Sequence, residues 1–199
     1  MKILAISGSA RKVSTNTALL RAMQNLAPAG VELLVIDNLN TLPVFSPDME
    51  GEKTPVVVGE FIEAVSVADG IIISSPEYVR AIPGGLKNAI DWMVSGFEII
   101  AKPIALVHAS HRGDDMLASL RLVLSTVSSN FLENLFFRIP LIGKSPQEIT
   151  EILSLPEHES QVTSFLLNFV ATQKMTESTP ISTVESVAPR NSAVPRPSP

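Results

Sequence analysis

Residues 7–17 combine small, hydroxyl-bearing and cationic side chains directly after a short apolar run. The segment reads Ser7-Gly8-Ser9-Ala10-Arg11-Lys12-Val13-Ser14-Thr15-Asn16-Thr17, and a helical pattern follows it. Small residues permit a tight turn, hydroxyls and a guanidinium donate hydrogen bonds, and a helix N-terminus offers free N–H groups. The segment therefore predicts a phosphate site. The alternative is that Ser14 or Asn16 only caps the following helix.

A second segment, residues 75–92, contains the chain's single tyrosine. It reads Ser75-Pro76-Glu77-Tyr78-Val79-Arg80-Ala81-Ile82-Pro83-Gly84-Gly85-Leu86-Lys87-Asn88-Ala89-Ile90-Asp91-Trp92. Because this segment follows an apolar run, Tyr78 is expected where a planar ligand can lie against its ring. The alternative is an ordinary surface tyrosine.

Three other kinds of site find little support in the sequence. His108 and His111 are spaced like metal ligands, but no third ligand cluster accompanies them. A Walker loop is excluded because Arg138 stands where its first glycine should be, and neither a GxGxxG nor a GxSxG motif is present. We expect no metal site and no hydrolase triad.

These segments follow apolar runs that have the character of buried strands. The runs cover residues 3–6, 33–36, 71–73 and 104–107, with a fifth candidate at 134–139. None alternates polar with apolar residues, which is typical of strands buried on both faces. Between them lie stripes of helical period, formed by Leu19, Leu20, Met23 and Leu26; Val58, Phe61, Ile62 and Val65; Leu86, Ala89, Ile90 and Met93; Met116, Leu120, Val123, Leu124 and Val127; and Val162, Phe165, Leu166, Phe169 and Val170.

Alternation of strands and helices predicts an α/β fold, a doubly wound five-stranded parallel sheet with helices on both faces. In such sheets ligands bind beyond the carboxyl ends of the strands. The segments after the first, third and fourth strands should therefore meet there.

Composition narrows the possible partners. Across 199 residues, 15 Lys and Arg face 20 Asp and Glu, giving a net charge of −5 that argues against nucleic acid. No cysteine is present, so redox chemistry would need a cofactor. No apolar run approaches the roughly 20 residues that span a bilayer, and the start has no signal-peptide layout, so we expect no membrane partner and a cytoplasmic location.

Residues 1–174 are predicted to form one domain, and residues 175–199, rich in Ser, Thr and Pro, a disordered tail.

Two motifs together resemble the NADPH-dependent FMN reductase family. They are Gly-Ser-x-Arg-x-x-Ser-x-Asn after the first strand and Pro-Glu-Tyr-x-x-x-x-Pro-Gly-x-Leu-Lys-Asn-Ala-x-Asp-Trp after the third. The resemblance covers roughly residues 1–172. It implies a flavodoxin-like fold, bound FMN, and hydride transfer from NADPH or NADH to a small electron acceptor such as a quinone, flavin, azo dye or metal oxyanion. It also implies a homodimer or homotetramer.

The resemblance assigns roles residue by residue. The flavin phosphate would be surrounded by Ser9, Arg11, Ser14, Asn16 and Thr17, and the isoalloxazine ring would be lined by Pro76, Glu77 and Tyr78. Apart from the two motifs, we expect Ser110, after the fourth strand, to donate to the pyrimidine edge of the ring. No residue need act as acid, base or nucleophile, because the cofactor does the chemistry.

The segment after the fourth strand departs from the family pattern. Many members carry a glycine-rich loop there, whereas this chain has Ser110-His111-Arg112-Gly113-Asp114-Asp115. Either His111 or Arg112 would favour a negatively charged reduced ring; the alternative is that an aspartate caps the next helix and Arg112 is solvated. Val79 stands where many members have Asn.

Two other functions are alternatives to a reductase, and one residue suggests an oligomer interface. A flavodoxin-type electron carrier would bind FMN but be reduced by a partner protein. A receiver domain is disfavoured because the first strand ends in Ser7-Gly8-Ser9 rather than an acidic pair. Trp92 lies off the apolar stripe of its helix and predicts an anchor for a second subunit; the alternative is that it covers a loop of its own chain.

Overall fold

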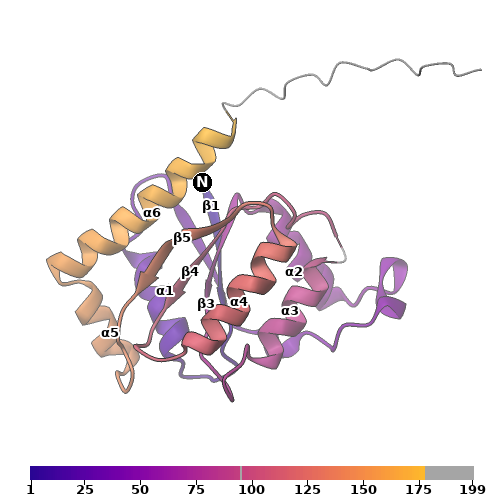
Figure 1. Ribbon diagram of the computed structural model, residues 1–199, viewed down its shortest axis with the longest axis horizontal. Helices are drawn as coiled ribbons and strands as arrows, with labels where there is room; N and C mark the ends of the chain where they lie inside the picture. The colour runs from indigo at the N-terminus through magenta and orange to yellow at the C-terminus, as the bar shows by residue number, and fades with distance from the viewer. Residues whose placement is uncertain (95, 178–199) are drawn as a thin grey trace, which may run out of the picture.

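A parallel sheet forms the centre of the protein (Figure 1). The computed structural model describes residues 1–94 and 96–177 and, within them, five strands: β1 (Lys2–Ser7), β2 (Glu32–Ile36), β3 (Gly70–Ser74), β4 (Ile104–His108) and β5 (Phe131–Arg138). Their order is β2-β1-β3-β4-β5, with every pair parallel. The predicted five-stranded doubly wound sheet is confirmed, and this strand order is the flavodoxin-like one.

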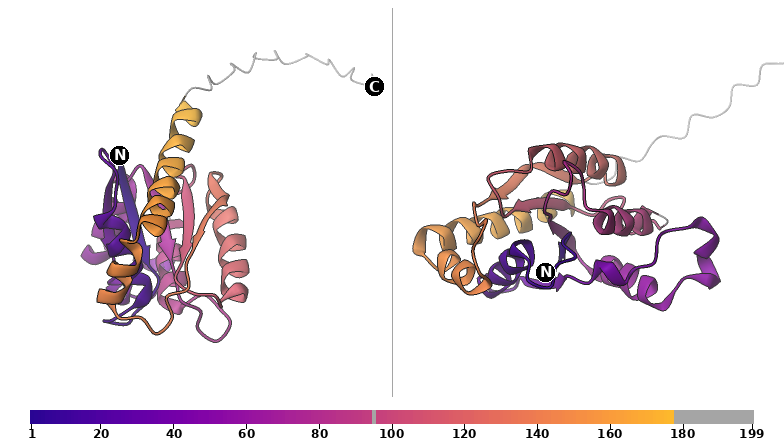
Figure 2. Two further views of the ribbon diagram at one scale, coloured as in Figure 1. Left: turned by 90° about the vertical axis from the view of Figure 1, so that its left-hand side faces the viewer. Right: turned by 90° about the horizontal axis from the view of Figure 1, so that it is seen from below.

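Helices cover both faces of the sheet. They are α1 (Thr15–Asn25), α2 (Val56–Val67), α3 (Gly84–Val94), α4 (Asp114–Val127), α5 (Pro146–Leu153) and α6 (Pro156–Glu177), and three short 3-10 turns, Leu39–Thr41, Pro47–Met49 and Gly51–Lys53, lie between β2 and α2. One core cluster joins the sheet to α2, α3 and α4, and the other joins it to α1, α5 and α6. The sheet therefore lies between two helical layers (Figures 1 and 2).

Burial divides the strands into central and edge positions. All residues of β3 and β4 are buried, as are all residues of β1 after Lys2. The expectation of burial on both faces is wrong for β2, where Leu34 is 52% exposed. As an edge strand, β2 has a neighbour on one side only, and its apolar run alone does not reveal that position.

The prediction that Trp92 is an exposed interface anchor is wrong. Trp92 is 1% exposed, its indole Nε1–H donates to the Pro43 carbonyl at 2.8 Å, and its ring meets Phe45 edge to face. Asn88, one turn earlier, donates to the same carbonyl at 2.9 Å and accepts the Phe45 N–H. This second face of α3 therefore holds the loop between β2 and α2, which runs past α3 (Figure 1). The alternative, that Trp92 covers a loop of its own chain, is confirmed.

The C-terminal helices extend the fold beyond the predicted elements. Helix α5 has no counterpart among the predicted stripes, although Ser145 and Glu148 form a capping box at its start. Helix α6 continues to Glu177, three residues past the predicted domain boundary. The rest of the predicted tail, residues 178–199, lies outside the described residues. Within the described ranges, no helix is both long and apolar enough to cross a bilayer.

Candidate functional site

A cavity of about 360 Å³ opens at the carboxyl ends of β1, β3 and β4. It is lined by Ser9, Arg11, Ser14, Thr15, Asn16, Pro76, Glu77, Tyr78, His108, Ala109, Ser110, Arg112, Gly113, Ile142 and Gly143. The predicted meeting of three segments at this edge is therefore observed. Eight of the nine predicted site residues line the cavity.

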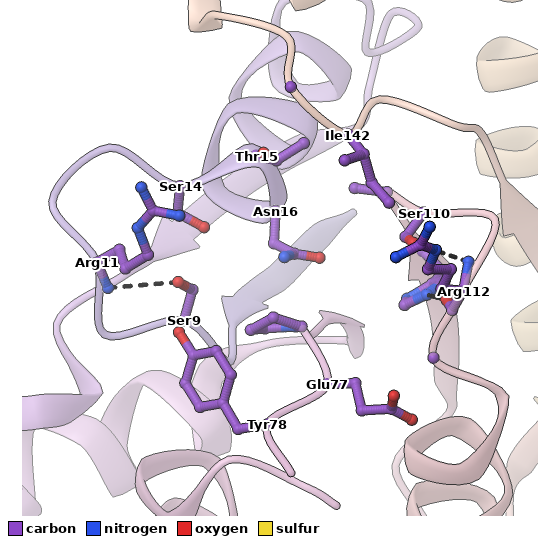
Figure 3. Close-up of a pocket in the computed structure, with 15 residues that line it drawn as sticks. Ser9, Arg11, Ser14, Thr15, Asn16, Glu77, Tyr78, Ser110, Arg112 and Ile142 are labelled. Atoms are coloured by element: carbon purple, nitrogen blue, oxygen red, sulfur yellow. Dashed lines mark hydrogen bonds between the residues drawn. The ribbon is translucent and has the colours of Figure 1, made fainter. Parts of the chain in front are cut away.

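One side of the cavity is the turn from β1 into α1. Ser14 is the N-cap of α1, and its Oγ accepts the Thr17 N–H at 3.4 Å. The helix-cap reading of Ser14 is thus correct, and it coexists with a place in the cavity. Helix geometry leaves the first N–H groups, those of Thr15 and Asn16 among them, without an intrahelical acceptor. Arg11 lies beside Ser14 at the start of this helix (Figure 3).

Asn16 and Thr17 differ in where their side chains lie. The Asn16 Oδ1 accepts a hydrogen bond from Ser74 Oγ at 2.9 Å, so its amide is held at the cavity between the ends of β1 and β3. The Thr17 hydroxyl instead pairs with Ser7 Oγ at 2.8 Å in the buried interior. Thr17 is the one predicted site residue that does not line the cavity, because its position on α1 turns it toward the sheet.

Gly8 brings the segments after β1 and β3 into contact. Its N–H donates to the Ser74 carbonyl at 2.8 Å, and a Cβ at this position would lie 2.6 Å from Ser75 Oγ and 2.9 Å from Leu86 Cδ2. A side chain would push these segments apart. The glycine therefore fixes the distance between two walls of the cavity.

A second wall is a hairpin turn from Tyr78 to Ala81. The two residues exchange backbone hydrogen bonds of 3.2 and 3.0 Å, and the central residues, Val79 and Arg80, have φ values of 51° and 58°. Two successive positive φ values make a type I′ turn, which normally uses Asn and Gly. Tyr78 is 40% exposed and faces the cavity beside Ser9 (Figure 3).

The hairpin is fastened to the start of α4. The Glu77 carboxylate accepts the Met116 N–H at 3.0 Å, and Arg80 pairs with Asp115 at 2.5 Å. The hydrogen bond and charge of Arg80 lower the pKa of Asp115. The alternative in which an aspartate, Asp114 or Asp115, caps α4 is wrong, since the N-cap is Gly113 and Glu77 supplies the capping oxygen. Glu77 therefore points toward α4 rather than into the cavity centre (Figure 3).

The third wall is the loop after β4, which faces the first across the cavity (Figure 3). Ser110 Oγ accepts the Arg112 N–H at 2.8 Å, a bond that does not use the hydroxyl hydrogen. The hydroxyl hydrogen can therefore be donated to a ligand. Arg112 is exposed, as the alternative of a solvated side chain expects, but it also lines the cavity, whereas His111 is exposed outside the lining.

His108, the last residue of β4, lies beneath this loop. It is 1% exposed, and its Nε2 lies 2.5 Å from the Arg112 carbonyl. Burial lowers the pKa of His108, against the opposing effect of that carbonyl, and thereby favours the neutral ring. Two features require glycine at position 113. A Cβ there would lie 2.9 Å from His108 Nε2, and the residue has a φ of 97°.

Several lining residues were not predicted from the sequence. Three of them, Thr15, Ala109 and Gly113, lie in or next to the segments discussed above. Their side chains carry no group that suggested a contact with a ligand. Ile142 and Gly143 come from the loop after β5, whose carboxyl end lies at the same edge because the sheet is parallel; no residue type in that loop marked it as part of the site. The one local signal was the glycine at 143, which the structure places at a φ of 79°.

The strained turn beside Tyr78 makes a stability prediction. A non-glycine residue in the left-handed region costs roughly 1 to 2 kcal/mol, least for Asn, and Val79 is branched at Cβ and 99% exposed. Val79→Asn should therefore raise the free energy of unfolding by about 0.5 to 1 kcal/mol in urea denaturation. Val44→Asn, at an exposed valine without positive φ, is the matched control. A gain of the same size in both variants would contradict the strain account.

Comparison with known proteins gives one family. The sequence profile of the family described as NADPH-dependent FMN reductase matches residues 1–141. The quinone reductase of Escherichia coli (strain K12) is 34% identical over 116 residues, which are 57% of this chain and 61% of that protein. A 2-hydroxy-1,4-benzoquinone reductase of Burkholderia sp. is 39% identical over 92 residues, 46% of this chain and 49% of that one. The matches thus span half to three fifths of the relatives' length.

Solved structures agree with the fold. The flavoenzyme NAD(P)H:(acceptor) oxidoreductase of Paracoccus denitrificans superposes with a TM-score of 0.64, covering 86% of this chain and 98% of that one at 22% identity. At this identity the likeness concerns the fold alone. The doubly wound sheet is thus shared with that protein.

Proposed function

The chain belongs to the NADPH-dependent FMN reductase family, and from this premise we propose that it is an FMN-dependent oxidoreductase. It would transfer hydride from NADPH or NADH, through bound FMN, to a small electron acceptor. Quinones head the candidate acceptors, since relatives that match over part of their length are named quinone reductases. The nicotinamide donors are intracellular, so the proposal places the protein in the cytoplasm.

One observation carries the proposal: a single cavity joins an anion-binding turn to a wall with an aromatic ring. The turn after β1 offers the Arg11 guanidinium, the start of α1 and the hydroxyls of Ser9 and Ser14. Each charge-assisted hydrogen bond contributes about 1.5 to 3 kcal/mol, so three or four such bonds would hold a phosphate dianion. The remaining walls carry Tyr78 on one side and Ser110 on the other. The residues present therefore fit FMN.

Each wall has a separate task in the proposed reaction. Bound FMN would supply the redox chemistry, accepting hydride from the nicotinamide and giving electrons to the acceptor. Ser9, Arg11, Ser14 and Asn16 anchor the phosphate, and Pro76, Glu77 and Tyr78 shape the ring's surroundings. Ser110 donates from its free hydroxyl hydrogen. Arg112 supplies positive charge on that side of the cavity, which favours a ring carrying extra negative charge.

Steady-state kinetics distinguish the reductase from a carrier. We expect the FMN-loaded protein to consume NADPH or NADH in the presence of a soluble quinone, with parallel double-reciprocal lines because donor and acceptor use one site in turn. The protein stripped of flavin is the control. If the loaded protein binds FMN tightly but turns over neither nicotinamide, the flavodoxin-type carrier is the better account.

We also propose that the protein forms a homo-oligomer through α3 and α4. An apolar groove of about 640 Å³ lies between them, lined by Phe45, Lys87, Ile90, Asp91, Val94, Leu122, Val123, Thr126 and Val127. Leu122 is 70% exposed, and a two-fold axis through this groove would bring the same apolar patch of a second copy against it. With Trp92 buried, this surface replaces it as the proposed contact.

A charge on this surface tests the oligomer. Leu122→Glu should shift the sedimentation coefficient toward the monomer, because it would bury an unpaired carboxylate in the interface. Leu167→Glu, at a similarly exposed leucine on α6, should leave the oligomer intact. If the two variants sediment alike, α3 and α4 do not form the interface.

A further inference from the structure

Arg138 ends β5 and makes three contacts to the wall opposite the phosphate turn. Its Nε donates to the Ser110 carbonyl at 2.6 Å, its Nη2 donates to the Arg112 carbonyl at 3.1 Å, and its Nη1 pairs with Asp114 Oδ1 at 2.7 Å. The side chain does not line the cavity. It therefore lies behind the wall.

Two of the three acceptors of Arg138 belong to residues of that wall, and the third belongs to the helix that follows it. Ser110 and Arg112 line the cavity, and Asp114 begins α4. The Arg112 carbonyl is shared, since it also lies 2.5 Å from Nε2 of His108, the register partner of Arg138 on the neighbouring strand. Two strand ends thus converge on one carbonyl of the loop.

We propose that Arg138 is a positioning residue, which holds residues 110–113 in the shape that binds the flavin ring. The inference rests on the proposed function. Without the guanidinium, the Ser110 carbonyl and the Asp114 carboxylate lose the partner on Arg138, the Arg112 carbonyl keeps only His108, and the wall loses its side-chain bonds to β5. The free-energy cost of ordering the loop would then be met on ligand binding, which lowers the affinity for the ligand.

The geometry calls for arginine rather than any cation. A guanidinium is a planar fork whose N–H groups reach several fixed acceptors at once, whereas lysine offers a compact charge on a flexible stem. Lysine at this position would keep the charge near Asp114 without spanning both carbonyls. We therefore expect Arg138→Lys to behave like Arg138→Gln.

Flavin affinity gives the first test. Arg138→Gln and Arg138→Lys should weaken FMN and riboflavin by the same factor, about tenfold, because the wall contacts the ring and not the phosphate. Arg121→Gln is the matched control: Arg121 also joins α4 to β5, through the Glu133 carbonyl at 2.8 Å and the Phe136 ring, but contacts no wall residue. It should leave both affinities unchanged.

Hydrogen exchange of the flavin-free protein gives a second test that needs no ligand. Arg138→Gln should speed exchange of the Arg112 amide, which is bonded to Ser110, while the strand amides of β1 and β3 stay protected. Unchanged exchange and unchanged affinities, or full rescue by lysine, would overturn the inference. If the unmodified protein itself binds no flavin, the proposed function fails, whereas the exchange result still decides whether Arg138 holds the loop.

Discussion

Replacing Arg11 with alanine should weaken FMN binding by about tenfold to a hundredfold and leave riboflavin binding nearly unchanged. The estimate follows from the loss of one charge-assisted hydrogen bond to a phosphate, worth roughly 1.5 to 3 kcal/mol. Only FMN carries the dianion. In the described part of the chain, the Arg11 guanidinium makes no ion pair or hydrogen bond; only the backbone N–H of Arg11 is bonded, to Ser9 Oγ. The fold should therefore tolerate the change.

The neighbouring lysine provides the control for this prediction. Lys12→Ala removes the same charge from the same turn, but Lys12 does not line the cavity. Its effect on FMN should be small and should vanish at high salt. Isothermal titration of both flavins against both variants measures the four affinities. Equal losses of FMN and riboflavin in the Arg11 variant would contradict the phosphate assignment.

Replacing Tyr78 with alanine should affect the ring of the flavin rather than its phosphate. We expect an altered visible flavin spectrum, slower reduction by NADPH, and an affinity loss of about threefold to tenfold that is equal for FMN and riboflavin. The loss corresponds to an aromatic contact of about 0.5 to 1.5 kcal/mol. Stopped-flow reduction and flavin titration check these outcomes.

Tyr78→Phe is the matched variant because it keeps the ring and removes only the hydroxyl. It should retain the spectrum and most of the rate. The hairpin itself is held by backbone bonds between Tyr78 and Ala81 and by Arg80, so neither substitution removes its anchors. A Tyr78→Ala protein with the original spectrum and rate would show that Tyr78 is an ordinary surface residue.

The central strands and most helices could be predicted because their burial leaves a local pattern. β1, β3 and β4 are continuous apolar runs, and α1 and α4 carry stripes of helical period. The exposure of β2 could not be predicted in this way, because it depends on strand order. Helix α5 was missed since its buried residues, Ile149 and Leu153, are too few to make a stripe.

The contiguous parts of the site could also be predicted, because residue types and strand ends place them at one edge. The turn after β1 and the segment after β3 are examples. Contacts between distant segments could not be predicted. Trp92 is buried by a loop some 49 residues away, and Arg138 reaches Ser110 across 28 residues. The spacing of residues near Trp92 or near Arg138 does not indicate either contact.

The most direct test of the central claim is an anaerobic titration of the FMN-loaded protein with NADPH and, separately, with NADH. If the cavity holds FMN for reduction by a nicotinamide, at least one of the two should bleach the visible flavin absorbance stoichiometrically, and a quinone added afterwards should restore it. Dithionite serves as the control for complete reduction. A flavin that dithionite bleaches but neither nicotinamide reduces would contradict the account.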